Sequence, residues 1–206
     1  MADPAERPPL ILASGSPYRR KMLVDAGLVF EVIPASVDEA ALKRDFAGRT
    51  PTPAPSVVAD GLARAKAQAV SQVHPRGLVI GADQILALGD DLLDKPGTDA
   101  AVRVQLERLR GKTHRLISAV ALAEAGEIVW SHTEEAVLTM RSFSPEFLDR
   151  YVAQSGSRVR DIVGAYEIEG PGIQLFERVS GDHFTIIGLP LVPLLAALRA
   201  RGVIAT

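Results

Sequence analysis

The sequence predicts an α/β fold with a mixed β-sheet. Short apolar runs alternate along most of the chain with longer segments of helical spacing, which is typical of strands joined by helices. Two consecutive strand-like segments, 115–123 and 128–140, are separated by the tight turn Ala125-Gly126 and are expected to pair as an antiparallel hairpin. The chain shows no internal repeat and no linker long enough to separate independent domains.

Apolar runs, helical spacing and breaker residues place each element. The strands are expected at 10–13, 30–34, 78–82 with an extended continuation over 85–88, 115–123, 128–140 and 173–179. The helices are expected at 17–26, 57–73, 99–109, 145–152 and 191–202. The proline-rich residues 50–55 are predicted to form a flexible or variable loop, and the glycine-studded residues 164–172 another loop.

Short polar side chains precede several of these helices. Ser16 can accept a hydrogen bond from the first helical turn, and Pro17 suits the first helical position because its φ is fixed. Gly27 can close the same helix. The same pattern predicts N-caps at Ser56, Thr98 and Ser144. The apolar stripe of the second helix is expected at Val58, Leu62, Ala65 and Ala69.

Composition excludes several classes of protein. The 206 residues are 47% hydrophobic, enough to bury a core, and no cysteine is present to form a disulfide, a thiolate zinc site or a nucleophile. A net charge of −2 gives no support to nucleic-acid binding. No apolar run reaches the roughly 18 residues of a membrane span, and the first nine residues lack the apolar core of a signal peptide. We therefore expect a soluble cytoplasmic protein that binds neither nucleic acid nor membrane.

The segment from Ser14 to Arg20 is a candidate anion site. It stands where a strand leads into a helix, and backbone N–H groups at a helix N-terminus attract anions. Arg19 and Arg20 lie in the first turn, where the helix dipole disfavours cations, so a phosphate chain would relieve the conflict. The alternative is that both arginines are solvated on a surface helix.

Acidic side chains and two lysines form the other candidates. Asp83 ends an apolar strand, where ligands usually bind in open α/β sheets, and the pair Asp38-Glu39 follows another strand. One or two carboxylates with phosphate oxygens suffice to hold Mg²⁺, although each acid could equally cap a turn. Lys66, near the boundary of a buried helix face, and Lys95, held extended by the following proline, can each pair with phosphate or simply be solvated.

Taken together, these segments resemble the Maf family of nucleotide pyrophosphatases. The matching segments occur in the family's order: residues 12–17 with Arg19-Arg20, Val37-Asp38-Glu39, Ala65-Lys66-Ala67, Gly81-Ala82-Asp83, Lys95-Pro96, 164–170 and Gly188-Leu189-Pro190-Leu191. The resemblance implies a two-lobed α/β fold, with a twisted mixed sheet flanked by helices and a cleft, similar to inosine triphosphate pyrophosphatases. It implies one such domain over residues 9–206, preceded by a disordered or extended segment 1–8. It also implies a homodimer and a divalent cation, Mg²⁺ or Mn²⁺.

The resemblance assigns roles to individual residues. Asp83 matches the family's active-site acid and proton acceptor, and Glu39 matches an acid that positions metal or water, so these two would be both the catalytic residues and the metal ligands. The positions that match phosphate contacts are Ser14, Arg19, Arg20, Lys66 and Lys95.

Three further positions track substrate choice within the family: Tyr18, Gln84 and Glu169. The branch acting on dTTP and UTP usually has arginine, threonine and glutamine there, whereas the branch described as 7-methyl-GTP pyrophosphatases has an aromatic residue, glutamine and glutamate. This chain is similar to the second branch. Tyr18 could stack on a cationic methylated purine, or only pack against the sheet, and Glu169 could accept hydrogen bonds from the guanine edge.

The predicted function is hydrolysis of a nucleoside triphosphate to a monophosphate and diphosphate, with 7-methyl-GTP as the favoured substrate and house-cleaning of modified nucleotides as a role. A dTTP/UTP pyrophosphatase of the same family is the alternative within the enzyme class. Outside it, the alternatives are a non-catalytic nucleotide-binding regulator of cell division and a nucleic-acid-binding module, which the near-neutral charge disfavours.

Overall fold

The computed structural model describes residues 8–205, so most of the expected N-terminal segment 1–8 lies outside the described residues. The chain divides into two compact units. The first contains the chain up to Asp83, then Ser118–Glu134 and the segment from His183 onward; the second contains Gln84–Ile117 and Glu135–Asp182.

Both units are built on strands of one mixed sheet, as the sequence predicts. The strand order is β2 (Glu31–Val32), β1 (Leu10–Leu12), β3 (Leu78–Leu88), β5 (Thr113–Glu124), β6 (Glu127–Met140) and β7 (Phe176–Ser180), with β4 (Asp91–Leu93) paired to β3. β1 pairs in parallel with β2 and β3, whereas β4 and β7 pair antiparallel with β3 and β6. Ala125 and Gly126, both at positive φ, form the two-residue turn between β5 and β6.

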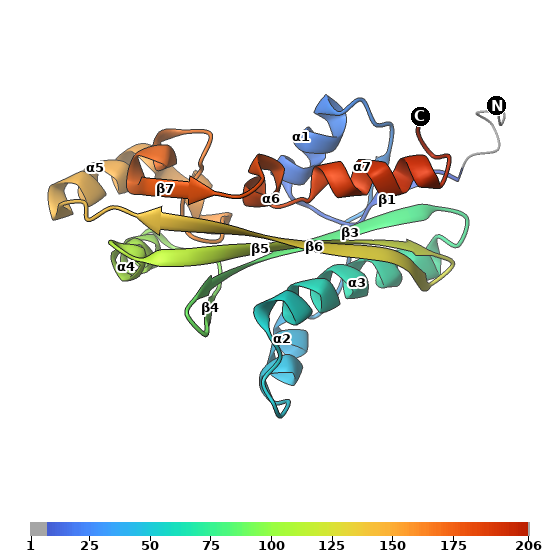
Figure 1. Cartoon of the computed structure of the whole chain (residues 1–206), viewed down its shortest axis with the longest axis horizontal. Helices are drawn as coiled ribbons and strands as arrows, with labels where there is room; N and C mark the ends of the chain where they lie inside the picture. The colour runs from blue at the N-terminus through green and yellow to red at the C-terminus, as the bar shows by residue number, and fades with distance from the viewer. Residues whose placement is uncertain (1–7, 206) are drawn as a thin grey trace. The chain divides into compact units, whose positions relative to one another are not determined.

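In the first unit, helices lie on both faces of the sheet. Figure 1 shows α1 (Pro17–Asp25), α6 (His183–Ile187) and α7 (Leu191–Ala200) on one face, with α3 (Pro55–Val73) on the other and α2 (Glu39–Ala47) beyond it. Alternate strand residues face α1 and α7, because successive side chains of a strand point to opposite faces. The resulting core includes Leu10, Leu12, Leu78, Ile80, Val120 and Leu122 from the strands and Leu23, Leu194 and Leu198 from the helices.

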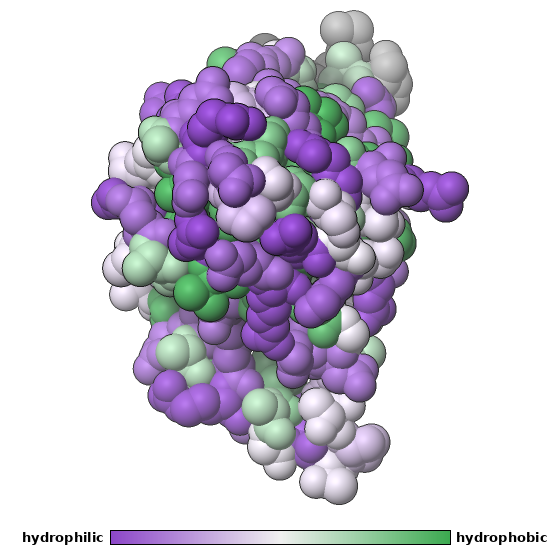
Figure 2. All heavy atoms as spheres, turned by 90° about the vertical axis from the view of Figure 1, so that its left-hand side faces the viewer, coloured by the Kyte–Doolittle hydropathy of each residue, from purple (hydrophilic) through white to green (hydrophobic). Residues whose placement is uncertain are grey.

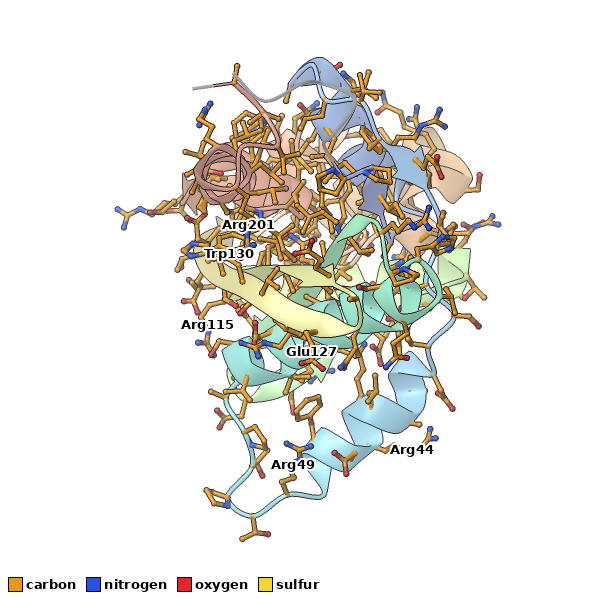
Figure 3. All side chains as sticks on the ribbon, turned by 90° about the vertical axis from the view of Figure 1, so that its right-hand side faces the viewer. Arg44, Arg49, Arg115, Glu127, Trp130 and Arg201 are labelled. Atoms are coloured by element: carbon orange, nitrogen blue, oxygen red, sulfur yellow. The ribbon has the colours of Figure 1, made fainter. Side chains whose placement is uncertain are left out.

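The C-terminal end of α7 is tied to β6. Arg201 donates a hydrogen bond from Nη2 to the carbonyl oxygen of Val129 at 2.7 Å, and Figure 3 shows Arg201 near Trp130. Trp130 is the single tryptophan of the chain. Its fluorescence therefore reports specifically on the first unit.

The second unit packs α4 (Asp99–Leu109) and α5 (Pro145–Ser155) with 3-10 turns at Gly156–Asp161 and Pro171–Leu175. Its surface around α5 and β7 is largely hydrophilic, with apolar residues in scattered patches (Figure 2). Within this unit His114, on β5, is buried, and its Nε2 lies 2.7 Å from the hydroxyl of Tyr166.

Most predicted helix starts are confirmed. The Oγ of Ser16 accepts from the backbone N–H of Arg19, and Thr98 and Ser144 cap α4 and α5 in the same way. Ser56 is not a cap, because Pro55 occupies the first helical position of α3 and Ala54 precedes it.

The buried face of α3 is rotated from the predicted stripe, since Ala65 and Ala69 are only partly buried. The buried residues are Val58, Ala59, Leu62, Ala63, Lys66, Ala67, Val70 and Ser71.

Several other expectations need correction. Helices α2 and α6 and strand β4 were not predicted; Asp38, read as part of an acidic turn, caps α2 through a 2.8 Å hydrogen bond to the N–H of Ala41. The strand expected at 30–34 shrinks to two residues. The strand expected at 173–179 begins at Phe176, because Pro171–Leu175 forms a 3-10 turn whose Gly172 packs against the backbone of Glu167. Among the described residues, none of the helices combines the length and apolar character needed to cross a membrane.

Gly81 sets the distance between β3 and α3. A Cβ at this position would lie 2.3 Å from the carbonyl oxygen of Ala63 and 2.5 Å from the backbone nitrogen of Ala67, closer than any contact that such atoms tolerate. The absence of a side chain therefore lets the helix backbone rest directly on the strand.

We expect Gly81→Ala to lower the free energy of unfolding of the first unit by about 1–3 kcal/mol, because the added methyl group must push α3 off the sheet. Urea unfolding followed by Trp130 fluorescence measures this change. The matched control is Gly48→Ala, where φ is −79° and the nearest atoms to an added Cβ are 3.5 Å away. A Gly81→Ala protein as stable as the control would contradict the close packing.

His114 should make the second unit sensitive to acid. Burial lowers its pKa from 6.5 to about 4, and its Nδ1 has no hydrogen-bond partner among the described residues. Because the folded state binds the proton less readily than the unfolded state, stability should fall as the pH drops from 6.5 towards 4, by about 3 kcal/mol in all.

Unfolding midpoints measured across this pH range, with circular dichroism as the probe, test the expectation. His114→Gln should lose less stability on acidification than the wild type, whereas His74→Gln, at the partly buried end of α3, should follow the wild-type profile. Equal pH dependence in all three proteins would refute the assignment to His114.

Candidate active site

Three charged side chains from three separate elements meet in the first unit. Lys66, on α3, places its Nζ 2.6 Å from Oδ1 of Asp83, near the middle of β3, and 2.8 Å from Oε1 of Glu39, the first residue of α2. The side chains of Lys66 and Asp83 are about nine-tenths buried, with 10% and 9% exposed, whereas that of Glu39 is 47% exposed. The cluster is thus a buried ion pair, Lys66–Asp83, with a second, half-exposed carboxylate that contacts the same ammonium group.

The packing at Gly81 explains why Lys66 reaches Asp83. Residues two apart on a strand share a face, so Asp83 lies on the face of β3 that α3 covers. The backbone of α3 touches Gly81 at Ala63 and Ala67. Lys66 stands beside those two residues on the buried side of α3, and its side chain extends along the contact to the carboxylate.

A second close contact positions Glu39. Gly61 of α3 lacks a side chain where the ring of Phe46 from α2 presses against it; an added Cβ would lie 2.3 Å from Cζ of that ring. Arg49 covers the same ring at 4.4 Å from its centroid, at the end of α2 seen in Figure 3. With this end of α2 seated on α3 and its start fixed by the Asp38 cap, Glu39 is directed to Lys66.

The guanidinium of Arg19 links three segments beside this cluster. Its Nε donates to the carbonyl oxygen of Gly188 at 2.9 Å, and its Nη1 donates to the carbonyl oxygen of Ala82 at 3.0 Å and to Oγ of Ser14 at 3.1 Å. Ser14 is buried and also accepts from the N–H of Ser16. These acceptors account for a cation in the first turn of α1 without a bound phosphate, so phosphate contact by Arg19 stays a prediction.

Electrostatics couples Arg19 to both acids. Burial lowers the pKa of Arg19, and the negative charges of Asp83 and Glu39 act in the opposite direction. The arginine remains protonated at any physiological pH. Arg19 and Lys66 therefore carry two positive charges against the two negative charges of Asp83 and Glu39, and these four side chains are together formally neutral.

The remaining predicted site residues are more dispersed. On α1, Tyr18 is partly buried and Arg20 is exposed. Gln84 directly follows Asp83 on β3, Lys95 is exposed between β4 and α4, and Glu169 is exposed just before the 3-10 turn at Pro171–Leu175; these three belong to the second unit. Their convergence with the acids stays a prediction.

Two features of the site escaped the sequence-based reasoning. The backbone carbonyls of Ala82 and Gly188 are hydrogen-bond acceptors for Arg19, although nothing in their side chains signals this role. In the sequence, Gly188-Leu189-Pro190-Leu191 stands out as a segment that matches the Maf family and precedes the last helix, but its pattern gives no sign that the Gly188 carbonyl accepts from Arg19.

Comparison with known proteins places this geometry in a family. The model of the family described as Maf-like protein matches residues 9–201. A protein of Mesorhizobium japonicum named 7-methyl-GTP pyrophosphatase is 49% identical over 195 residues, covering 95% of this chain and 97% of that protein. A protein of Paramagnetospirillum magneticum named nucleoside triphosphate pyrophosphatase is 52% identical over 192 residues, covering 93% of this chain and 98% of that protein. With nearly the whole chain matched, the protein belongs to the Maf-like family.

Proposed function

We propose that the protein is a nucleoside triphosphate pyrophosphatase, which hydrolyses a nucleoside triphosphate to a monophosphate and diphosphate. The observation that carries the proposal is the convergence of Glu39, Lys66 and Asp83 from three elements on one point. The names of the similar proteins from Mesorhizobium japonicum and Paramagnetospirillum magneticum support the same reaction.

The carboxylates of Glu39 and Asp83 fit a divalent cation, Mg²⁺ or Mn²⁺. Both place an oxygen within 2.8 Å of the same cationic nitrogen, so both can reach one shared cation. No group of three or more acidic or histidine side chains suited to a metal exists among residues 8–205, which is consistent with an ion completed by phosphate oxygens and water. When bound, such an ion supplies positive charge to the phosphate oxygens and lowers the pKa of bound water.

The side chains of the site would then divide the work. The Asp83 carboxylate orients a water molecule and accepts its proton as the water oxygen bonds to the α-phosphorus. The bond from that phosphorus to the bridging oxygen breaks, and diphosphate leaves with the electron pair. Lys66 and the positive groups of the Ser14 to Arg20 segment, with Lys95, stabilise the charge on the leaving group. Because Arg19, Lys66, Asp83 and Glu39 are together formally neutral, the triphosphate needs further positive charge, which Arg20, Lys95 and the cation would supply.

The favoured substrate is 7-methyl-GTP. The similar protein from Mesorhizobium japonicum is named for this substrate. Tyr18 offers an aromatic face to a cationic base, and Glu169 offers acceptors for the guanine edge. Gln84 is the third of the positions that track substrate choice in the family. We further propose that the enzyme is a cytoplasmic homodimer that binds no nucleic acid, the last because the net charge of −2 gives no support to such binding.

Asp83→Asn should lower kcat by about 10²–10⁴-fold, because an amide cannot accept the proton that a general base removes. Release of diphosphate from 7-methyl-GTP with Mg²⁺, and its loss in EDTA, measures the activity. The variant also weakens the pair with Lys66, so circular dichroism must confirm that it is folded at the assay temperature. The control is Asp25→Asn, an exposed acid paired with Lys21. An Asp83→Asn enzyme with wild-type kcat would end the assignment.

A substrate panel separates the alternatives. We expect kcat/KM to be highest for 7-methyl-GTP among 7-methyl-GTP, GTP, dTTP, UTP and CTP. Glu169→Gln should lower kcat/KM for 7-methyl-GTP by about 10- to 100-fold through loss of charged hydrogen bonds, while Glu177→Gln, exposed on β7, should not. Preference for dTTP or UTP would favour the other branch of the family, and no turnover of any nucleotide would favour a non-catalytic regulator.

A further inference from the structure

We infer that Lys66 is an internal counter-ion that keeps divalent cations out of the Glu39–Asp83 pair until a polyphosphate draws its ammonium group away. The inference rests on the proposed function and deepens it, because it states the order in which that site accepts its two ligands. Lys66 thus controls access of the cation as well as contacting phosphate.

The position of the ammonium group is the first support. Lys66 Nζ lies 2.6 Å from Asp83 Oδ1 and 2.8 Å from Glu39 Oε1, so one cationic atom already bridges the two carboxylates. A cation shared by both carboxylates needs the same space and satisfies the same oxygens. Lys66 and a divalent cation therefore compete for one location.

Burial makes that competition costly for the cation. The Lys66 and Asp83 side chains are each about 10% or less exposed, so moving Lys66 away without another anion leaves a buried ammonium uncompensated. The backbone of α3 packs directly on β3 at Gly81 and buries one face of the helix, so Lys66 cannot leave by withdrawal of the helix without loss of this packing. In the absence of nucleotide, the cation must therefore displace a buried ammonium group from both carboxylates.

A polyphosphate removes this obstacle. Phosphate oxygens are strong acceptors for an ammonium group and provide Lys66 with a second anion. Once Lys66 pairs with phosphate, the carboxylates of Glu39 and Asp83 are available to the cation. Binding of nucleotide and binding of cation should then reinforce each other, and the coupling must be equal in both directions. Glu39, half exposed at the mouth of the pair, has room to adjust as the exchange occurs.

An ordinary structural ion pair predicts a different result. If Lys66 only stabilises the fold, its removal lowers stability and leaves cation affinity unchanged. If Lys66 is the counter-ion, its removal leaves the Glu39 and Asp83 carboxylates opposed only by the charge of Arg19, and this vacant pair binds a divalent cation directly. Mn²⁺ binding to the nucleotide-free protein distinguishes the two, and it requires no catalytic turnover.

The test compares Mn²⁺ affinity by electron paramagnetic resonance titration of the nucleotide-free full-length protein. Lys66→Met should bind Mn²⁺ at least about 10-fold more tightly than the wild type, because the charge is removed and the stem is kept. Lys21→Met, which removes the exposed lysine paired with Asp25, should bind like the wild type. Adding Asp83→Asn to Lys66→Met should abolish the gain, which locates the bound ion.

Thermal unfolding provides an independent measurement. Lys66→Met should melt below the wild type in EDTA, since two carboxylates lose their counter-ion, and Mn²⁺ should restore its midpoint while barely moving that of the wild type. If Lys66→Met does not fold, Lys66→Gln retains a hydrogen-bond donor without the charge and carries the same expectations.

One result would overturn the inference: Lys66 variants that bind Mn²⁺ no more tightly than the wild type in the absence of nucleotide. That result would leave the proposed pyrophosphatase activity intact if diphosphate is still released from 7-methyl-GTP. Conversely, absence of that release together with tight Mn²⁺ binding by Lys66→Met would reject the function and retain the counter-ion role of Lys66.

Discussion

The contact between α3 and β3 at Gly81 is the constraint on which the site depends. Because a Cβ there would overlap the backbone of Ala63 and Ala67, only glycine lets the helix lie this close to the strand. The short distance between the two backbones lets Lys66 reach Asp83. In the same way, the missing side chain of Gly61 lets the ring of Phe46 pack against α3, and Glu39 then pairs with the same ammonium group. The close packing at Gly81 and Gly61 thus brings the three charged side chains within ion-pair distance of one another.

Burial gives that cluster its chemical character. Removing either partner of the Lys66–Asp83 pair would leave an unpaired charge inside the protein, so the pair is stable only as a unit or after exchange with other charges. A triphosphate and a divalent cation bring both signs of charge at once. The formal neutrality of the four clustered side chains therefore fits the proposed substrate, a polyphosphate that carries its own divalent cation.

Two backbone carbonyl groups accept hydrogen bonds from Arg19, a role that the pattern of side chains in the sequence does not reveal. Arg19 holds the start of α1, the Ala82 carbonyl beside Asp83 and the Gly188 segment together through three hydrogen bonds. In the second unit, the side chain of buried His114 contacts the hydroxyl of Tyr166, which lies in the glycine-rich segment 164–172 that also carries Glu169. Arg19 therefore has a structural role whether or not it also contacts phosphate, and the two roles have to be separated by experiment.

The sequence by itself determined the α/β class, the hairpin turn, the caps at Ser16, Thr98 and Ser144 and, through ordered motifs, the family and the candidate residues. Turns, caps and motifs depend on residues that are close together in the sequence, so their pattern can be recognised without the tertiary structure. The sequence missed α2, α6 and β4 and misplaced the buried face of α3, because short helices and face rotation depend on tertiary contacts. Only the tertiary structure decided that Glu39, Lys66 and Asp83 share one point. They lie far apart in the chain, and no sequence period relates them; the packing of α2 and α3 on β3 alone sets their distances.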